Sequence, residues 1–592
     1  MIRHAVVIAA TLAASAAFLI SQSTGDDDAL LRAMRDEMER SRQLRVIGGG
    51  EDLPYFISYT VSDQENFNIS AAMGAPINIG HSKFRAPSIE VRVGSYDFDH
   101  TGHIFSGFYS GSRYDTDSWP LDENYAAFRE ALWLGTDRAY KAALESIARK
   151  RAALNSAAAP AEKLADFSPA QPVKSIAKIS HKKINEAAWT SRMEKLSGIF
   201  NSYPEILSSG AEFQLIAGAT YLTNSEGTAL RYPDDLATVY AKAEGQAPDG
   251  MLLTEAVSFQ TLDVESLPAE AELRKAFTGI AEDIRALVHA PAGESFSGPV
   301  LFEPQAAAQL FAQLLGDNLR LPRKPLAEPG RPVNFLPSEL ETRIGGRVLP
   351  DWMEVIDDPT QTSWQGKPLV GSYPFDLEGV APRPVSVIEK GMLKSFLSTR
   401  QPIKGSAASN GHARLPGAYG TRNAAIGNLF VKASETMPLA ELKKKLTDLV
   451  TERGKPYGML VRKLDYPFAS GASDLQTLAQ SSAQAGGSVR PVSPPVLVYR
   501  VYPDGREELV RGLRFRGVSS RSLRDILAAS QETALFDYVN NAAPLAMLGA
   551  GGYLSPTSVV APAVLFDEIE LERRQDQLPK PPVVPPPNAK TQ

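Results

Sequence analysis

The chain is 592 residues long, more than a single hydrophobic core usually serves, so we expect two large domains. Hydrophobic residues make up 43% and charged residues 22% of the sequence, a composition that excludes a mostly disordered or collagen-like chain. The net charge of −6 comes without a pronounced basic block, which argues against nucleic acid as a partner. The sequence contains no cysteine, and this excludes disulfides, thiolate nucleophiles and Cys-ligated zinc.

Residues 1–23 have the pattern of a signal peptide. A short basic start precedes an uncharged apolar run from Ala5 to Ile20, and polar sequence follows at once. The run is shorter than the about 20 residues that a membrane-spanning helix needs. We therefore expect an exported protein, periplasmic or extracellular, that meets the membrane only during export and is cleaved near Ser23.

The first half of the chain alternates helical and strand-like patterns. Apolar residues at helical spacing predict helices over 28–44 and 124–154, and a third helix that carries Trp189, Met193, Leu196 and Phe200 on one stripe. Strict alternation predicts a strand over 88–93, and further strands are expected over 212–222 and after a turn at 224–227. The Ala, Pro and Ser-rich stretch 155–180 reads as a surface crossing. These elements predict an α+β domain.

The second half has many short apolar segments separated by glycine and proline. Helices are expected over 304–317, near 439–453 and near 523–540, and the remainder predicts a large antiparallel sheet, barrel-like or sandwich-like. The predicted organisation is therefore a signal peptide (1–23), an amino-terminal α+β domain (24–295), a β-rich carboxyl-terminal domain (296–575) and a mobile proline-rich tail (576–592).

Few residues point directly to chemistry. His100 and His103 form the closest histidine pair; a surface turn is the favoured interpretation and a metal cluster the alternative. His412 stands in a polar loop and could bind a ligand or cap the turn. The sequence has no His-Glu-x-x-His, no Gly-x-Ser-x-Gly and no phosphate-binding Gly-x-x-x-x-Gly-Lys pattern, and the glycines at 549–552 read as a flexible loop.

Several segments in series resemble the TldD/PmbA (TldD/TldE) family, whose better-known members form a metallopeptidase. The turn Asn224-Ser225-Glu226-Gly227 is similar to a hairpin of the family's amino-terminal domain. It is followed, in family order, by the segments 355–359, 374–380 and 387–397, the last of which predicts two short strands around Glu389-Lys390-Gly391. The resemblance is firmest over 210–570 and implies an α+β domain followed by a domain of antiparallel strands.

The resemblance also implies where zinc would bind, and this chain departs from it there. In zinc-binding members a helix carries His-Glu-x-x-Gly-His, and a distant cysteine completes the site. The matching positions here are Ala312, Gln313 and Asp317. Alanine cannot be a ligand, glutamine cannot act as a general base, and the cysteine is missing. We expect no zinc and no other cofactor.

These observations leave three functional hypotheses. The first is a non-catalytic member similar to the TldE (PmbA) branch, which would pair with a metal-bearing TldD-like subunit and bind unfolded peptide by strand addition. The second is a free-standing hydrolase with a relocated active site, for which the candidate residues are His412, Asp376, Glu378 and the His100/His103 pair. The third is an envelope-binding scaffold without catalysis.

Overall fold

The computed structural model describes residues 28–42, 52–104, 119–155, 164–327, 335, 337–417, 420–467, 492–540, 555–574 and 578–584. The expected signal peptide and the glycines at 549–552 lie outside these residues. No helix of the described chain is long and apolar enough to cross a membrane.

The amino-terminal half is built on a seven-stranded sheet in which β2, β1, β5, β6 and β4 lie in that order and β7 and β8 extend it beyond β5. β1 and β2 form a long antiparallel hairpin whose register shifts only near its two ends, between Pro54 and Phe56 and between Ser70 and Ala71, and β1 pairs β5 along its other edge. The strands are β1 (Pro54–Ala72), β2 (Ala75–Val93), β4 (Lys174–Ile176), β5 (Ile206–Asn224), β6 (Ala229–Pro233), β7 (Leu236–Gln246) and β8 (Leu252–Thr261).

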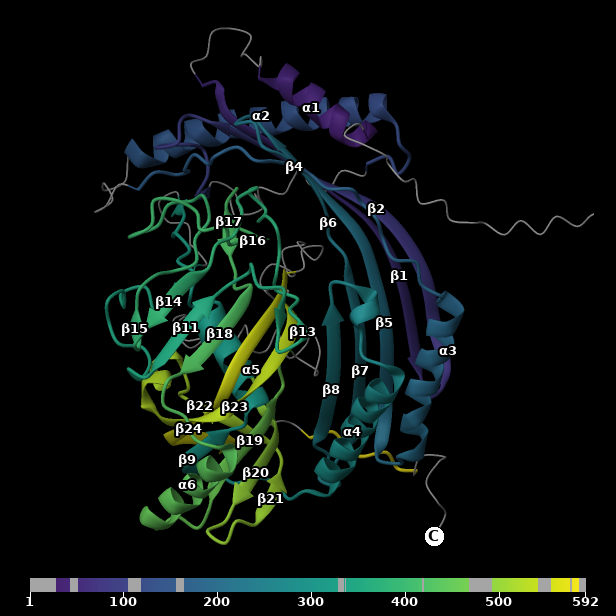
Figure 1. Cartoon of the computed structure of the whole chain (residues 1–592), viewed down its shortest axis with the longest axis vertical. Coiled ribbons are helices and arrows are strands. Elements are labelled where there is room, and N and C mark those ends of the chain that lie inside the picture. The colour runs from purple at the N-terminus through teal and green to yellow at the C-terminus, as the bar shows by residue number, and fades with distance from the viewer. Residues whose placement is uncertain are drawn as a thin grey trace, which may run out of the picture.

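Helices cover one face of this sheet. α1 (Ala29–Ser41) and the long α2 (Tyr125–Asn155) pack over one end, and α3 (Glu186–Ser197) and α4 (Glu270–His289) pack over the other (Figure 1). Alternate residues of β1 and β5 supply both hydrophobic cores, because strand side chains point to one face at every second position. The ring of Trp189 on α3, for example, stacks 4.0 Å from that of Phe213 on β5.

The other face of the same strands is polar. Glu212 and Gln214 of β5 are exposed, while Phe213 between them is fully buried. Tyr240 of β7 and Ser258 of β8 lie opposite each other, on the same face as Glu212. The sheet therefore presents a polar wall on the side without helices.

The carboxyl-terminal half is built on an eleven-stranded sheet. Its first strand in the sequence is β9, which lies inside the sheet between β24 and β19. Its neighbours are mostly antiparallel, but β9 pairs β19 and β18 pairs β24 in parallel. Its strands are β9 (Phe296–Phe302), β11 (Met353–Asp357), β14 (Val385–Glu389), β15 (Met392–Leu393), β18 (Asn428–Ala433), β19 (Gly458–Leu464), β20 (Pro495–Val501), β21 (Glu507–Val510), β22 (Leu513–Arg516), β23 (Ile526–Asn540) and β24 (Ser555–Arg573).

Among the described residues, two α-helices and two short strand pairs complete this half, and a third pair, β3 (His103–Ile104) with β10 (Leu326–Ala327), joins it to the first half. α5 (Pro304–Gly316) is buried in the largest hydrophobic core, and α6 (Leu439–Glu452) covers a smaller one. The other two strand pairs are β12 (Ser363–Trp364) with β13 (Lys367–Pro368), and β16 (Ala413–Pro416) with β17 (Arg422–Ala424). The two halves lie side by side in Figure 1.

The α+β fold and most of the predicted elements are confirmed. The expected helices appear as α1, α2, α3, α5 and α6, and the turn at 224–227 joins β5 to β6. The helix predicted near 523–540 is wrong, because Ile526–Asn540 is a strand that pairs with β24. The surface crossing is wrong in part, because Phe167 is 2% exposed. The division into domains stays a prediction.

Candidate functional site

α5, the helix at the family's zinc position, packs in the hydrophobic core. Ala312 is 3% exposed in the core around α5. The amide of Gln313 donates to the Gln309 carbonyl at 3.1 Å, and its Oε1 accepts the backbone N–H of Ser493 at 2.8 Å. Asp317 stands at the carboxyl end of the helix and forms an ion pair with Arg320 at 3.0 Å.

Gln309, one turn earlier, is a residue that the sequence analysis missed. Its side chain is 1% exposed, and it holds the end of β19 as a neighbouring strand would. Oε1 accepts the Leu464 N–H at 2.8 Å, and Nε2 donates to the carbonyls of Leu464 and Tyr466 at 3.1 and 2.6 Å. A buried glutamine with all of these partners satisfied has a structural role.

Aromatic side chains fill the space beyond the end of α5. The rings of Tyr466 and Tyr538 lie 5.2 Å apart, and Phe536 stacks 5.2 Å from Tyr538. Burial raises the pKa of Tyr538 well above its ordinary value, so its hydroxyl stays protonated. The polar groups of Gln309, Gln313 and Tyr538 are therefore neutral amides and a neutral phenol.

Zinc does not fit this set of residues. Structural and catalytic zinc sites use imidazole, thiolate and carboxylate ligands, usually three or four of them. Within the described chain, no group of three His, Cys, Asp or Glu residues is placed to hold a metal ion. The single carboxylate at the helix end, Asp317, already faces Arg320.

His412 lies in the fold's interior. Its side chain is fully buried; Nε2 lies 3.1 Å from Asp357 Oδ1, and Nδ1 lies 2.9 Å from Asn410 Oδ1. Asp357 also accepts the Gly427 N–H with both oxygens. The arrangement has the Asp–His geometry of a catalytic pair, but it connects the end of β11 to the loop before β16.

Asp376 and Glu378 lie next to this histidine in one turn. Asp376 accepts the N–H groups of Glu378, Val380 and Ala413, each within 3.0 Å. Burial raises the pKa of Asp376 to about 7, and it also raises the pKa of Glu378. Glu378 accepts the backbone N–H of Arg400 at 2.6 Å. The structure thus brings the three hydrolase candidates together, with each engaged in holding loops.

The Asn-Ser-Glu-Gly turn docks the first half of the molecule on the second. Glu226 Oε1 accepts from Arg400 Nη2 at 2.6 Å, and the Arg400 side chain is fully buried. The Arg400 guanidinium also donates to the Ser168 carbonyl and lies 4.0 Å from the centre of the Phe167 ring. Two of the segments that carry the family resemblance, 224–227 and 374–380, therefore meet at Arg400, because Glu378 also accepts its backbone N–H.

The histidine pair lies in a second buried region. His103 is 1% exposed on β3, and burial lowers the pKa of His100 to about 4. The interpretation of a surface turn is therefore wrong. The neighbouring Asp99 is fully buried and accepts from Arg92 at 2.7 Å. This is a network of internal ion pairs between sheet and loops.

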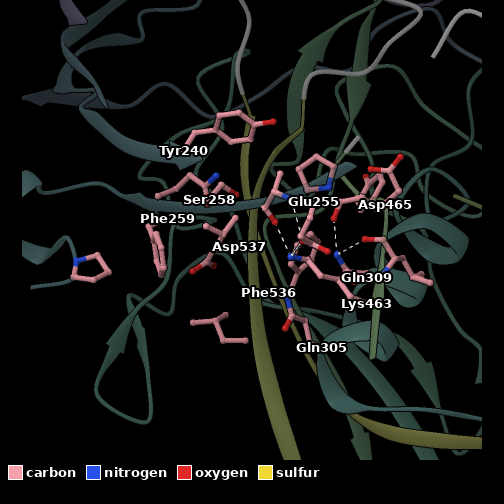
Figure 2. A pocket seen from close by; sticks show the side chains of 18 of the residues that line it. Tyr240, Glu255, Ser258, Phe259, Gln305, Gln309, Lys463, Asp465, Phe536 and Asp537 are labelled. Carbon is pink, nitrogen blue, oxygen red and sulfur yellow. Dashed lines mark hydrogen bonds and ion pairs between the residues drawn. The ribbon is translucent and has the colours of Figure 1, made fainter. Parts of the chain in front are cut away.

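A cavity lies elsewhere, between the two sheets. It has a volume of about 500 Å³ and is bounded by β8, the end of β19 and the outer part of β23 (Figure 2). Figure 2 shows Asp537 and Phe536 of β23 between Ser258 and Phe259 of β8 on one side and the Gln309 region on the other. A volume of about 300–1,000 Å³ is typical of ligand sites.

Two free strand edges border this cavity. Among the described strands, β8 pairs only β7, and the 533–540 part of β23 pairs only β24. Lys463 donates to the Ala256 carbonyl at 2.6 Å, so this carbonyl points away from β7. Because strand carbonyls alternate in direction, those of Ser258 and Gln260 point the same way. The outer edge of β8 is therefore available beyond Ala256.

Comparisons with known proteins agree with this architecture. Residues 295–462 match the PmbA/TldA metallopeptidase C-terminal domain. A metalloprotease from Archaeoglobus fulgidus is 37% identical over 78 residues, which are 13% of this chain and 17% of that protein's length. The chain thus spans less than a fifth of the curated relative it matches.

Solved structures share the fold over most of the chain. TldE from Thermococcus kodakarensis aligns with a TM-score of 0.52 and 13% identity, covering 92% of this chain and 100% of that one. A protein described as a modulator of DNA gyrase from Bacteroides thetaiotaomicron aligns with a TM-score of 0.54 and 12% identity, covering 93% and 99%. A protein of the same description from Thermotoga maritima aligns with a TM-score of 0.51 and 14% identity, covering 87% and 96%. The segment 295–462 therefore matches the PmbA/TldA metallopeptidase C-terminal domain, and most of the chain shares the fold of these solved structures.

Proposed function

We propose that this protein is an exported, non-catalytic member of the TldD/PmbA (TldD/TldE) family. It would bind unfolded peptide and work with a metal-bearing TldD-like subunit. The observation that carries the proposal is the use of α5. Gln309 and Gln313 lie on α5, the helix that matches the family's zinc motif. Their side chains form hydrogen bonds with the end of β19 and with the backbone of Ser493. A helix used in this way supports the fold instead of a metal.

The cavity between the free edges supports peptide binding. An extended peptide can pair with the outer edge of β8, because the backbone groups of Ser258 and Gln260 point toward it. Strand addition uses main-chain hydrogen bonds and therefore accepts many sequences, provided that the segment is unfolded. Folded proteins would be excluded, since their own strands are already paired.

A partner subunit would supply the hydrolysis. The expected complex buries more than about 1,000 Å², the usual lower bound for a specific interface. The test is to mix the purified chain with a metal-bearing family member encoded in the same organism and to measure mass by light scattering. Peptidase activity of each protein alone and of the mixture is then compared on an unstructured peptide. Activity only in the mixture, with one complex mass, is the expected result.

A metal measurement completes this test. Elemental analysis of the purified chain should find no stoichiometric zinc, because the Ala312 and Gln313 positions offer no ligand. One tightly held zinc per chain, or no complex with any metal-bearing sibling, would contradict the proposal.

The Asp357–His412 contact favours a second candidate function, a hydrolase with a relocated active site. Such an enzyme would have to open the loops that bury His412 before a substrate could reach it. Metal-independent peptide hydrolysis by the isolated chain, lost in His412→Ala and retained in the exposed-surface variant His289→Ala, would establish this alternative.

A further inference from the structure

The cavity between β8 and β23 has buried acceptors without partners. Gln260 is 7% exposed, lines the cavity and leaves Oε1 without a hydrogen bond to any described residue. Glu255 is 1% exposed and lines the same cavity; Oε1 meets Lys463, while Oε2 has no partner in the described chain. Buried polar atoms nearly always have a hydrogen-bond partner. Two unpaired acceptor oxygens at one cavity therefore indicate that a bound ligand supplies the donors.

Asp537 adds a third acceptor to this lining. Its Oδ1 accepts from the Ser558 hydroxyl at 2.6 Å, and that hydroxyl in turn accepts the N–H of Val370 at 3.0 Å. These hydrogen bonds fix the position of the carboxyl group, and its Oδ2 can accept a hydrogen bond from a ligand. Figure 2 shows Asp537 in the middle of the lining, between Phe259 and Phe536.

The charge of the lining favours a cation. Its acidic members are Glu255, Glu272, Asp465 and Asp537, and its basic members are Lys367 and Lys463. Lys463 already forms an ion pair with Glu255 and donates a hydrogen bond to the Ala256 carbonyl. The pKa of Asp537 supports the same conclusion, because burial raises it to about 7 although the Ser558 hydrogen bond and the attraction of Lys367 both oppose the rise. A cation beside this carboxyl would favour its ionised form.

We propose that this cavity is a specificity subsite for a basic side chain, a lysine ammonium or an arginine guanidinium, of a peptide paired with β8. The inference rests on the proposed peptide binding and adds the class of peptide. An ammonium carries three donors and a guanidinium five, which suits a lining of acceptor oxygens. The apolar stem of either side chain would pack between Phe259 and Phe536, with the charged head among the acceptors.

The test uses short fluorescent peptides of one unstructured sequence whose central residue is lysine, arginine, norleucine or glutamate. Binding to the full-length purified protein is measured by anisotropy at about pH 8, where Asp537 is mostly ionised. Lysine and arginine peptides should bind about tenfold more tightly than the norleucine peptide, and the glutamate peptide more weakly still. The norleucine peptide reports main-chain pairing alone.

Variants locate the effect. Asp537→Asn should bring the lysine and norleucine affinities together, and Gln260→Glu should increase the preference for lysine. Asp448→Asn, the same change on the exposed face of α6, should leave the preference as it is in the unmodified protein. Gln260→Glu tests a gain, so it remains informative if Asp537→Asn folds poorly.

The outcomes separate the two proposals. If all four peptides bind equally, strand addition stands and the basic-side-chain subsite is wrong. If lysine is preferred but neither variant changes the preference, the subsite lies elsewhere and the inference is overturned. If no peptide binds, the proposed function fails and the subsite fails with it.

Discussion

At the scale of single residues, one buried charged side chain connects the two halves of the molecule. Arg400 is the largest side chain that the described fold buries completely, and it binds Glu226 and the Ser168 carbonyl across the junction of the two halves. Its planar guanidinium also lies 4.8 Å from the Phe56 ring and 4.0 Å from the Phe167 ring. Lysine could not reproduce this combination of a forked donor and two stacked faces.

We predict that Arg400→Met strongly destabilises the protein. The change leaves Glu226 as a partly buried carboxylate without its guanidinium, and losing one partner of a buried pair costs about 3–5 kcal/mol. Urea unfolding of the variant should show this loss. Arg274→Met removes a half-exposed arginine from α4 and should cost less than about 1 kcal/mol. Equal effects of the two changes would contradict the junction's role.

Adding Glu226→Gln to Arg400→Met should recover part of the lost stability. The second change removes the uncompensated charge, so the double variant should lose less than the sum of the two single losses. A simple sum in the double-mutant cycle would show that the two side chains do not interact.

Asp537 gives stability a pH dependence of known sign. Burial raises the pKa of this carboxyl from 3.8 to about 7 in the folded protein. Between these values the folded state binds the proton and the unfolded state does not. The contribution of this carboxyl to the free energy of unfolding is therefore complete below about pH 4 and is lost as the pH rises through about 7. Asp537→Asn removes this loss.

The expected result is that Asp537→Asn gains stability relative to the unmodified protein on going from about pH 5 to about pH 8, by up to about 1.4 kcal/mol for each pH unit in the window. Asp376, whose pKa burial also raises to about 7, is present in both proteins and cancels in the difference. Urea midpoints at the two pH values measure it. A constant difference would contradict the burial of this carboxyl.

At the scale of elements, α5 shows how far sequence reasoning reaches. A helix is expected over 304–317, and the structure confirms it as α5, which is buried in the largest hydrophobic core. The role of Gln309 could not be foreseen, because its partners at Leu464 and Tyr466 lie more than 150 residues away in the sequence. The same limit applies to the cavity, whose lining comes from β8, β19 and β23.

The wrong helix near 523–540 has a physical cause. Its apolar spacing fits a helix locally, but Ile526–Asn540 pairs along β24, and this tertiary pairing overrides the local preference. Pro562 in β24 is accommodated where β23 changes register and where the pairing of β24 passes from β18 to β9. Ser530 fills the gap by accepting the Ala563 N–H at 2.8 Å.

We predict that Gln309→Leu costs about 2–4 kcal/mol of unfolding free energy. The change leaves the Leu464 N–H and two carbonyls buried without partners, and each unpaired group costs about 1–3 kcal/mol. Gln305→Leu, on the exposed side of the same helix, is the matched control and should change stability by less than about 0.5 kcal/mol. Equal losses at both positions would mean that Gln309 does not anchor β19.

At the scale of the whole molecule, the two sheets share more than a surface contact. α4 packs on the amino-terminal sheet, yet the hydrophobic core around it includes Leu497 of β20 and the partly buried Tyr499 and Leu509. The buried Arg400–Glu226 pair joins the halves at another place. The predicted domains are thus connected through apolar packing at one place and through an ion pair at another.

From this shared core we predict that the two halves unfold together. Calorimetry of the intact protein should show a single transition, because exposing α4 removes the cover of β20 at the same time. Leu497→Ala weakens the shared core and should broaden the transition or split it in two. Leu446→Ala removes the same side chain from the core under α6, within the carboxyl-terminal half alone, and should lower the midpoint without splitting it. Two transitions in the unmodified protein would show that the sheets fold independently and that the cavity between them can open without unfolding either one.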